Sequence, residues 1–99
     1  MLVAVDALYV YDGGTLAEAA DAVGSAIGVP LQLHDSSFYG ADYYVAQRDL
    51  DEGILLENYL EDDDEPFFRT QPVGAICVQV SGFDEARGRL AAVPGLRRA

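Results

Sequence analysis

The spacing of hydrophobic residues changes along the chain and separates segments of strand type from segments of helix type. Residues 2–11 are almost all apolar, β-branched or aromatic, which predicts a strand buried in the middle of a sheet. After an Asp-Gly-Gly turn, apolar residues recur at helical spacing over residues 16–27. Thr15 and Glu18 have the spacing of a capping box, and Gly28 follows as a helix stop. We therefore expect a helix across this segment.

The middle of the chain has the alternation typical of strands. Side chains in residues 38–47 alternate between two faces, with Tyr39, Tyr43 and Val45 on one face and Asp42 and Tyr44 on the other. Turn-forming residues then connect this strand to a returning one, which predicts a hairpin. The remaining segments are a short strand over residues 30–34, the hairpin turn over 48–53, the returning strand over 54–61, a loop over 62–72 and a strand over 73–80.

The last part of the chain predicts a second helix that starts near Phe83. Ser81 and Asp84 have the spacing of another capping box, and the apolar positions of the following segment fall on one helical stripe. These stripe positions are Phe83, Ala86, Leu90 and Val93. Pro94 and Gly95 end the helix, and we expect residues 96–99 to be a short frayed tail.

The order of elements predicts an α+β fold with the sequence β-α-β-β-β-β-α. Two amphipathic helices need one shared apolar surface, so we expect both on one face of a mostly antiparallel sheet of four to five strands. This arrangement is a two-layer sandwich whose other face is partly open. The length of 99 residues fits one acidic domain over residues 1–95, followed by the tail over 96–99.

The charge balance narrows the classes of partner. Seventeen acidic residues stand against six basic ones, all of them Arg, and the net charge is -11. Such a body repels nucleic acid phosphates and anionic lipid head groups and attracts basic surfaces. The N-terminus lacks the basic region of a signal peptide, no apolar run approaches membrane-spanning length, and Cys77 is the single cysteine. We therefore expect a cytoplasmic protein without direct contact to nucleic acid or membrane.

The acidic residues are concentrated in the middle of the chain. Eleven of them fall between Asp35 and Glu65, where Arg48 is the only base. Like charges closer than the Debye length of about 8 Å oppose folding, which favours a binding role for this stretch. Tyrosines follow the same predicted strands and are typical of binding hot spots. The expected partner-binding residues are Asp42, Tyr43, Tyr44, Glu57, Tyr59, Glu61, Asp62, Asp63, Asp64 and Glu65. The alternative is a solvated hairpin whose tyrosines pack beneath the helices.

The sequence gives weaker signals for catalysis, metals and cofactors. Cys77 lies in an apolar strand, which favours a core position over a nucleophile. The run His34-Asp35-Ser36 contains the residue types of a hydrolase triad, but sequence neighbours do not normally satisfy triad geometry. Residues 62–65 lack the alternating ligands of a calcium loop. The turn at residues 12–15 opens a helix but has no basic residue for a phosphate. We expect no catalytic residue, metal or cofactor.

One segment carries a resemblance to a known class of protein. Residues 35–44, Asp-Ser-Ser-Phe-Tyr-Gly-Ala-Asp-Tyr-Tyr, resemble a segment of small acidic actinobacterial proteins of the toxin-immunity type. The lysine-free, Ala- and Gly-rich composition also favours a GC-rich genome such as that of an actinobacterium. The resemblance implies an acidic domain that covers the basic active site of a cognate toxin, often a nuclease. It transfers no individual functional residue.

The leading hypothesis is an immunity-type inhibitor, not an enzyme, that neutralises a basic protein through its acidic, tyrosine-rich surface. A phage-type nucleic-acid mimic is a second hypothesis, and it predicts several unrelated DNA-binding targets. A third is a small-molecule-binding or catalytic domain that uses a cleft near residues 12–15. A fourth is a structural subunit whose open sheet face forms a homodimer.

Overall fold

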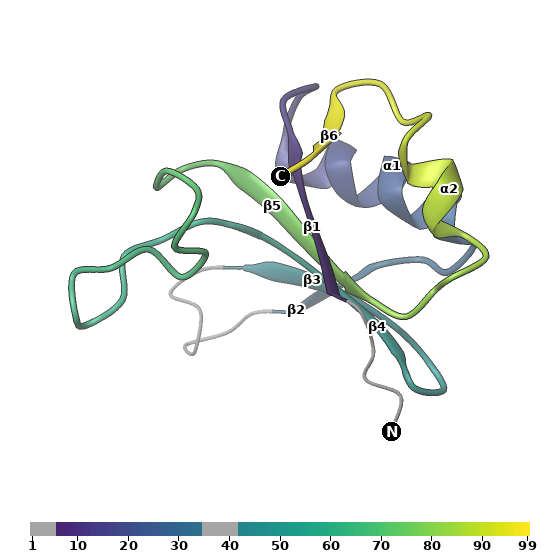
Figure 1. Cartoon of the computed structure of the whole chain (residues 1–99), viewed down its shortest axis with the longest axis horizontal. Helices are drawn as coiled ribbons and strands as arrows, with labels where there is room; N and C mark the ends of the chain where they lie inside the picture. Colours follow the sequence, from purple (N-terminus) through teal and green to yellow (C-terminus); the bar gives the residue numbers. More distant parts are fainter. Residues whose placement is uncertain (1–5, 35–41) are drawn as a thin grey trace.

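An antiparallel sheet forms one layer of the molecule, and two helices lie together on one side of it (Figure 1). The computed structural model describes residues 6–34 and 42–99. Within them the sheet has six strands in the order β2-β3-β4-β5-β1-β6. The strands are β1 (Asp6–Tyr11), β2 (Gln32–His34), β3 (Tyr43–Arg48), β4 (Asp51–Glu57), β5 (Ile76–Ser81) and β6 (Leu96–Arg98), and the helices are α1 (Leu16–Ile27) and α2 (Arg87–Leu90).

The predicted first helix is confirmed together with both of its ends. In the capping box, the backbone N–H of Glu18 donates to Thr15 Oγ1 at 3.2 Å, and Thr15 N–H donates to Glu18 Oε1 at 3.0 Å. Gly28 ends the helix in the left-handed conformation, with φ of 76°. The buried stripe consists of Ala19, Ala20, Val23, Ala26 and Ile27. The three alanines of this stripe allow α1 to lie close to the sheet.

The helix-side core is built from alternate residues of the central strands. Tyr9 of β1 is opposite Val78 of β5, which in turn is opposite Leu55 of β4. All three side chains belong to the cluster that α1 and Phe83 complete. The predicted two-layer α+β architecture with both helices on one face is therefore confirmed.

The opposite face of the sheet is covered in part. Residues 58–75, which we call the strap, follow β4 and lie between it and β5 in the sequence. Phe68 from the strap joins Val10, Leu56 and Cys77 in a second buried cluster on this face. The loop expected from the sequence is thus an apolar cover as well as a connection.

The second helix is shorter than the sequence predicts. The expected capping box at Ser81 is wrong, because Ser81 is the last residue of β5 and is opposite Glu52 in β4. The chain then turns through two left-handed residues, Gly82 with φ of 82° and Phe83 with φ of 53°. A side chain at Gly82 would collide with Asp51, so only glycine fits this turn. Helical geometry proper is limited to α2, although the predicted positions Phe83, Ala86 and Leu90 are buried.

The predicted frayed tail over residues 96–99 is wrong, since most of it forms β6. Leu96 and Arg98 are opposite Tyr11 and Tyr9 of β1, and Ala99 N–H donates to Leu8 O at 2.9 Å. Gly95 makes this return possible with φ of 81°, because a Cβ there would lie 2.6 Å from Gly13 Cα. The element order is therefore β-α-β-β-β-β-α-β, with more strands than expected.

The hairpin of β3 and β4 has a tighter turn than predicted. Arg48 is opposite Asp51, so only Asp49 and Leu50 lie in the turn, and Asp49 takes a left-handed φ of 55°. The predicted alternation in β3 is confirmed for the described residues, since Tyr43 and Tyr44 are opposite Leu56 and Leu55. The predicted strand residues 2–5 and 38–41, including Tyr39, lie outside the described residues.

Removing the side chain of Leu96 tests whether β6 is part of the folded sheet. We expect Leu96→Ala to lower the free energy of unfolding by about 2–4 kcal/mol, because a buried leucine side chain is lost from the core. Urea unfolding followed by circular dichroism measures this change. Arg98→Ala, at an exposed position of the same strand, is the control and should cost less than about 1 kcal/mol. Equal and small effects of both variants would contradict the role of β6.

Candidate functional site

The acidic residues of the middle stretch lie at two opposite ends of the sheet. Asp49, Asp51 and Glu52 are at the β3–β4 turn, in the lower right of Figure 1. The other end of the hairpin, where Tyr43 is opposite Leu56, is roughly 20 Å away at the rise of an extended strand. The expectation that the hairpin and the loop after it form one acidic surface is therefore wrong for these three residues. Asp35 lies outside the described residues.

The acidic residues expected to bind a partner are all exposed, at or beyond the other end of the hairpin. Asp42 precedes β3, Glu57 ends β4, and the rest form what we call the acidic tip, residues 61–65. The tip closes as a small hairpin: Glu61 N–H donates to Glu65 O at 2.9 Å, and Asp64 N–H donates to Glu61 O at 3.0 Å. In Figure 1 it belongs to the loop that projects to the left of the sheet.

The side chain of Asn58 fixes the strap that carries this tip. It is 2% exposed, and Asn58 is the one polar residue among the described residues that the protein fully buries. Its Oδ1 accepts from Phe68 N–H at 2.9 Å. The two hydrogens of its Nδ2 are shared among three carbonyl oxygens, those of Phe68 at 3.1 Å, Gln71 at 2.9 Å and Pro72 at 3.1 Å. One amide thus binds the strap at three residues and leaves none of its own polar atoms unsatisfied.

Aromatic rings connect the tip to the sheet. Tyr59 and Phe67 are stacked at the base of the tip, with ring centroids 5.4 Å apart and planes at 19°. The rings of Phe67 and Phe68 meet edge to face, with centroids 4.9 Å apart, and Phe68 is buried against the sheet. The Phe67 N–H donates to Tyr59 O at 2.9 Å. The acidic tip is therefore connected to the sheet through the packed rings of Tyr59, Phe67 and Phe68, which form its aromatic base.

The three expected tyrosines do not share one surface. Tyr44 packs against the helix-side core, whereas Tyr43 and Tyr59 are half-buried against the cluster on the opposite face. His34 stacks on Tyr43, with ring centroids 5.3 Å apart. Strand alternation alone places Tyr43 and Tyr44 on opposite faces. A surface that combines the acidic tip with aromatic contacts therefore contains Tyr43 and Tyr59 but not Tyr44.

Each of the six arginines has a partner within the chain. Two interact with carboxylates, two with backbone carbonyls and two with aromatic rings. The contacts are Arg69–Asp63 (3.3 Å), Arg97–Asp12 (3.0 Å), Arg87 Nε–Gly82 O (2.8 Å), Arg89 Nε–Ala26 O (2.7 Å), Arg48 over Phe83 (5.4 Å) and Arg98 over Tyr9 (5.7 Å). Two of these contacts are ion pairs, and one of the two carboxylates in them, that of Asp63, belongs to the tip.

The sequence signals for other chemistry have structural explanations. Cys77 is fully buried, and desolvation raises the pKa of its thiol to about 11, while Arg97 has a smaller opposite effect. A thiol with this pKa is protonated and unreactive at neutral pH. Only His34 of the His34-Asp35-Ser36 run lies in the described part of the chain. Within that part, no group of three His, Cys, Asp or Glu residues is arranged to hold a metal ion.

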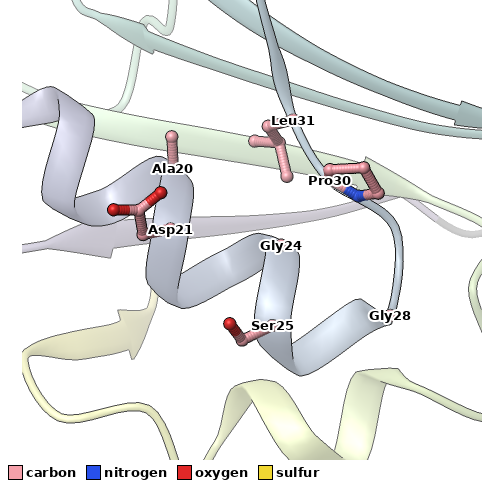
Figure 2. Close-up of a pocket in the computed structure, with 7 residues that line it drawn as sticks. All are labelled: Ala20, Asp21, Gly24, Ser25, Gly28, Pro30 and Leu31. Carbon is pink, nitrogen blue, oxygen red and sulfur yellow. The ribbon is translucent and has the colours of Figure 1, made fainter.

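Two surface hollows lie away from the acidic tip. The first, about 360 Å³, is bounded by α1 and the segment after it, and Figure 2 shows Leu31 and Pro30 on its far wall. The second, about 300 Å³, includes Gln32, His34 and Gln47. Neither is lined by residues 12–15, where a ligand cleft was an alternative expectation. There Asp12 N–H donates to Gly95 O at 2.7 Å, and β6 closes the turn.

Comparisons with known proteins add no relative. No family model matches the chain, and searches of curated proteins and of solved structures gave no match. In the described part of the chain, neither helix has the length and apolar character needed to cross a bilayer. The resemblance over residues 35–44 therefore stays a prediction, and all of that segment before Asp42 lies outside the described residues.

The Asn58 side chain offers a direct test of how the tip is held. We expect Asn58→Ala to lower the free energy of unfolding by about 2–3 kcal/mol, because buried partners lose their hydrogen bonds. Asn58→Asp should be worse at neutral pH, since a carboxylate would face three carbonyl oxygens.

The pH dependence of the aspartate variant gives the control. The new carboxyl group in Asn58→Asp should have a folded-state pKa above its unfolded value of about 4. Relative to the wild type, the variant should therefore be most stable below that pH and lose stability as the pH rises. Urea unfolding between acidic and neutral pH measures this slope. A variant with the pH dependence of the wild type would show that the Asn58 amide does not clamp the strap.

Proposed function

We propose that the protein is an acidic binding module of the immunity type, which neutralises a basic protein by covering its cationic surface. Its docking surface consists of the acidic tip, Asp42 and Glu57, with Tyr43 and Tyr59 as neighbouring aromatic contacts. Asp49 and Glu52 take no part, because they lie at the other end of the hairpin.

The observation that carries the proposal is the imbalance between engaged bases and unpaired acids. Every arginine already has an intramolecular partner, so the protein has few cations to offer an anionic ligand. Glu61, Asp62, Asp64 and Glu65 are exposed and form no ion pair within the described residues. A cationic partner would supply the missing counter-charges.

The form of the tip supports a protein as the partner. The tip is a folded hairpin on a clamped base, which lowers the ordering cost of binding compared with a disordered acidic segment. Carboxylates on such a base could occupy the positions that substrate phosphates take on a basic enzyme. Electrostatic steering would accelerate the association, and tyrosine contacts would slow the dissociation.

Charge reversal at the tip tests this function against a matched control. The partner for the experiment is the protein encoded next to this chain in its genome. Asp62→Lys/Asp64→Lys should slow association about tenfold at low salt and flatten its salt dependence, because steering is lost. Asp49→Lys/Glu52→Lys makes the same charge change at the opposite end and should have a much smaller effect. Stopped-flow association rates at several salt concentrations measure both.

Two results would contradict the proposal. One is the absence of any binding between the two purified proteins. The other is an equal loss of association rate in both double variants, which would show that only net charge matters. Binding to several unrelated DNA-binding proteins with similar affinity would instead support the nucleic-acid mimic.

A further inference from the structure

The larger of the two hollows lies between α1 and the segment that follows it (Figure 2). Gly28 ends α1 with a left-handed φ of 76°, and the chain then turns so that Pro30 and Leu31 form a wall beside the helix. Gly24 lets this wall approach, because a Cβ there would lie 3.3 Å from Val29 O and 3.4 Å from Leu31 Cδ1. The shape of the hollow therefore depends on two glycines of this part of the chain.

The lining combines carbon surface with one acidic side chain. Half-buried Leu31, buried Ala20 and exposed Pro30 supply the carbon surface. Asp21 and Ser25 are four residues apart, so they lie on one side of α1 and add a carboxylate and a hydroxyl group. The other lining residues are uncharged. The hollow thus places an apolar surface beside a single negative charge.

The charge of Asp21 has no counter-ion within the described residues. Neither ion pair involves its carboxylate, and no arginine lines the hollow. The last turn of α1 contains no basic residue, although Arg89 Nε of α2 donates to Ala26 O at 2.7 Å. The C-terminal end of a helix is electrostatically negative. A cation in the hollow would therefore interact favourably with Asp21 and with this end of α1.

The size and charge of the protein narrow the class of ligand further. A volume of about 360 Å³ is near the lower limit of small-molecule sites, so it suits a small ligand. The net charge of -11 repels anions and attracts cations. A metal ion needs several oxygen ligands, whereas the lining offers one carboxylate, and a metal ion would not use the apolar wall. An organic cation with an apolar stem matches both parts of the hollow.

We propose that the hollow is a binding site for a primary alkylammonium group. The ammonium group donates hydrogen bonds to the carboxylate of Asp21 and to the hydroxyl oxygen of Ser25, and the alkyl stem lies along Leu31 and Pro30. This site is separate from the acidic tip and does not depend on the proposed inhibitory function.

A nuclear magnetic resonance titration with pentylamine, at constant pH and ionic strength, tests the site residue by residue. The amide signals of Gly24, Ser25, Gly28 and Leu31 should shift and saturate in the millimolar range. Pentanol has a similar stem without the charge and should bind about fivefold more weakly. Methylamine has the charge with almost no stem and should bind about tenfold more weakly or worse.

Two variants with the same change in charge separate a specific site from general attraction to an acidic protein. Asp21→Asn should weaken pentylamine binding about fivefold, because the ion pair is lost. Asp62→Asn removes one carboxylate from the tip and should leave the affinity for the hollow unchanged. Both positions are exposed, and circular dichroism checks that both variants keep the fold.

Three results would overturn the proposal. The first is the absence of saturable shifts at the hollow, including shifts confined to the tip. The second is equal affinity of pentylamine for Asp21→Asn and Asp62→Asn. The third is equal binding of pentanol and pentylamine, which would show that the charge has no role. None of these measurements uses a protein partner, so failure of the inhibitory function leaves this site testable.

A second probe identifies the source of the alkylammonium group. Nα-acetyl-lysine methylamide carries the same group on a piece of peptide backbone. Binding of this probe with an affinity close to that of pentylamine would support the site as one for lysine side chains. Binding of pentylamine alone would support it as a site for free amines.

Discussion

The buried amide of Asn58 is the interaction on which the candidate surface depends. A sheet of this size leaves one face without helices, and the strap covers part of that face with Phe68. Tyr59 and Phe67 pack beside Phe68 in the same cluster, whereas the tip that the strap carries is exposed and highly charged. The buried side chain of Asn58 adds four hydrogen bonds, one accepted by Oδ1 and three made by Nδ2, and leaving its polar atoms unpaired would be costly. The position of the acidic tip follows from this one side chain.

The arginines and the carboxylates are distributed differently over the protein. With six arginines and seventeen acidic residues, the chain cannot neutralise its own charge. Its arginines make contacts within the folded chain. Arg89 caps the C-terminal end of α1, where a cation interacts favourably with the helix dipole. Arg97 fastens β6 to the turn at Asp12. The excess carboxylates remain on the surface, and those of the tip gather at one place because the strap is folded.

Local sequence signals were sufficient for much of the fold. Thr15, Glu18 and Gly28 determine α1 through contacts within a few residues, so both of its ends could be predicted. The β6 strand and the short α2 could not, because they depend on distant contacts. Leu96 is in a strand because it pairs with Tyr11 of β1, which is distant in the sequence. The turn at Gly82 depends on the close approach of that residue to Asp51.

The candidate surface was predictable to a similar extent. Alternation in β3 already separates Tyr43 from Tyr44, so this division was available from the sequence. The predicted turn over residues 48–53 also places Asp49, Asp51 and Glu52 at the far end of the hairpin, and only its two-residue length was not available from the sequence. Asn58 gave no signal beyond an amide within an apolar strand pattern. Its role becomes visible only when the carbonyls of residues 68–72 return to it.

Amide hydrogen exchange at Phe68 tests this account most directly, because that N–H donates to Asn58 Oδ1. The clamp predicts that it exchanges at least about a hundredfold more slowly than the exposed amide of Asp62 in the tip, after correction for intrinsic rates. Equal exchange at the two positions would show that the Asn58 amide does not hold the strap.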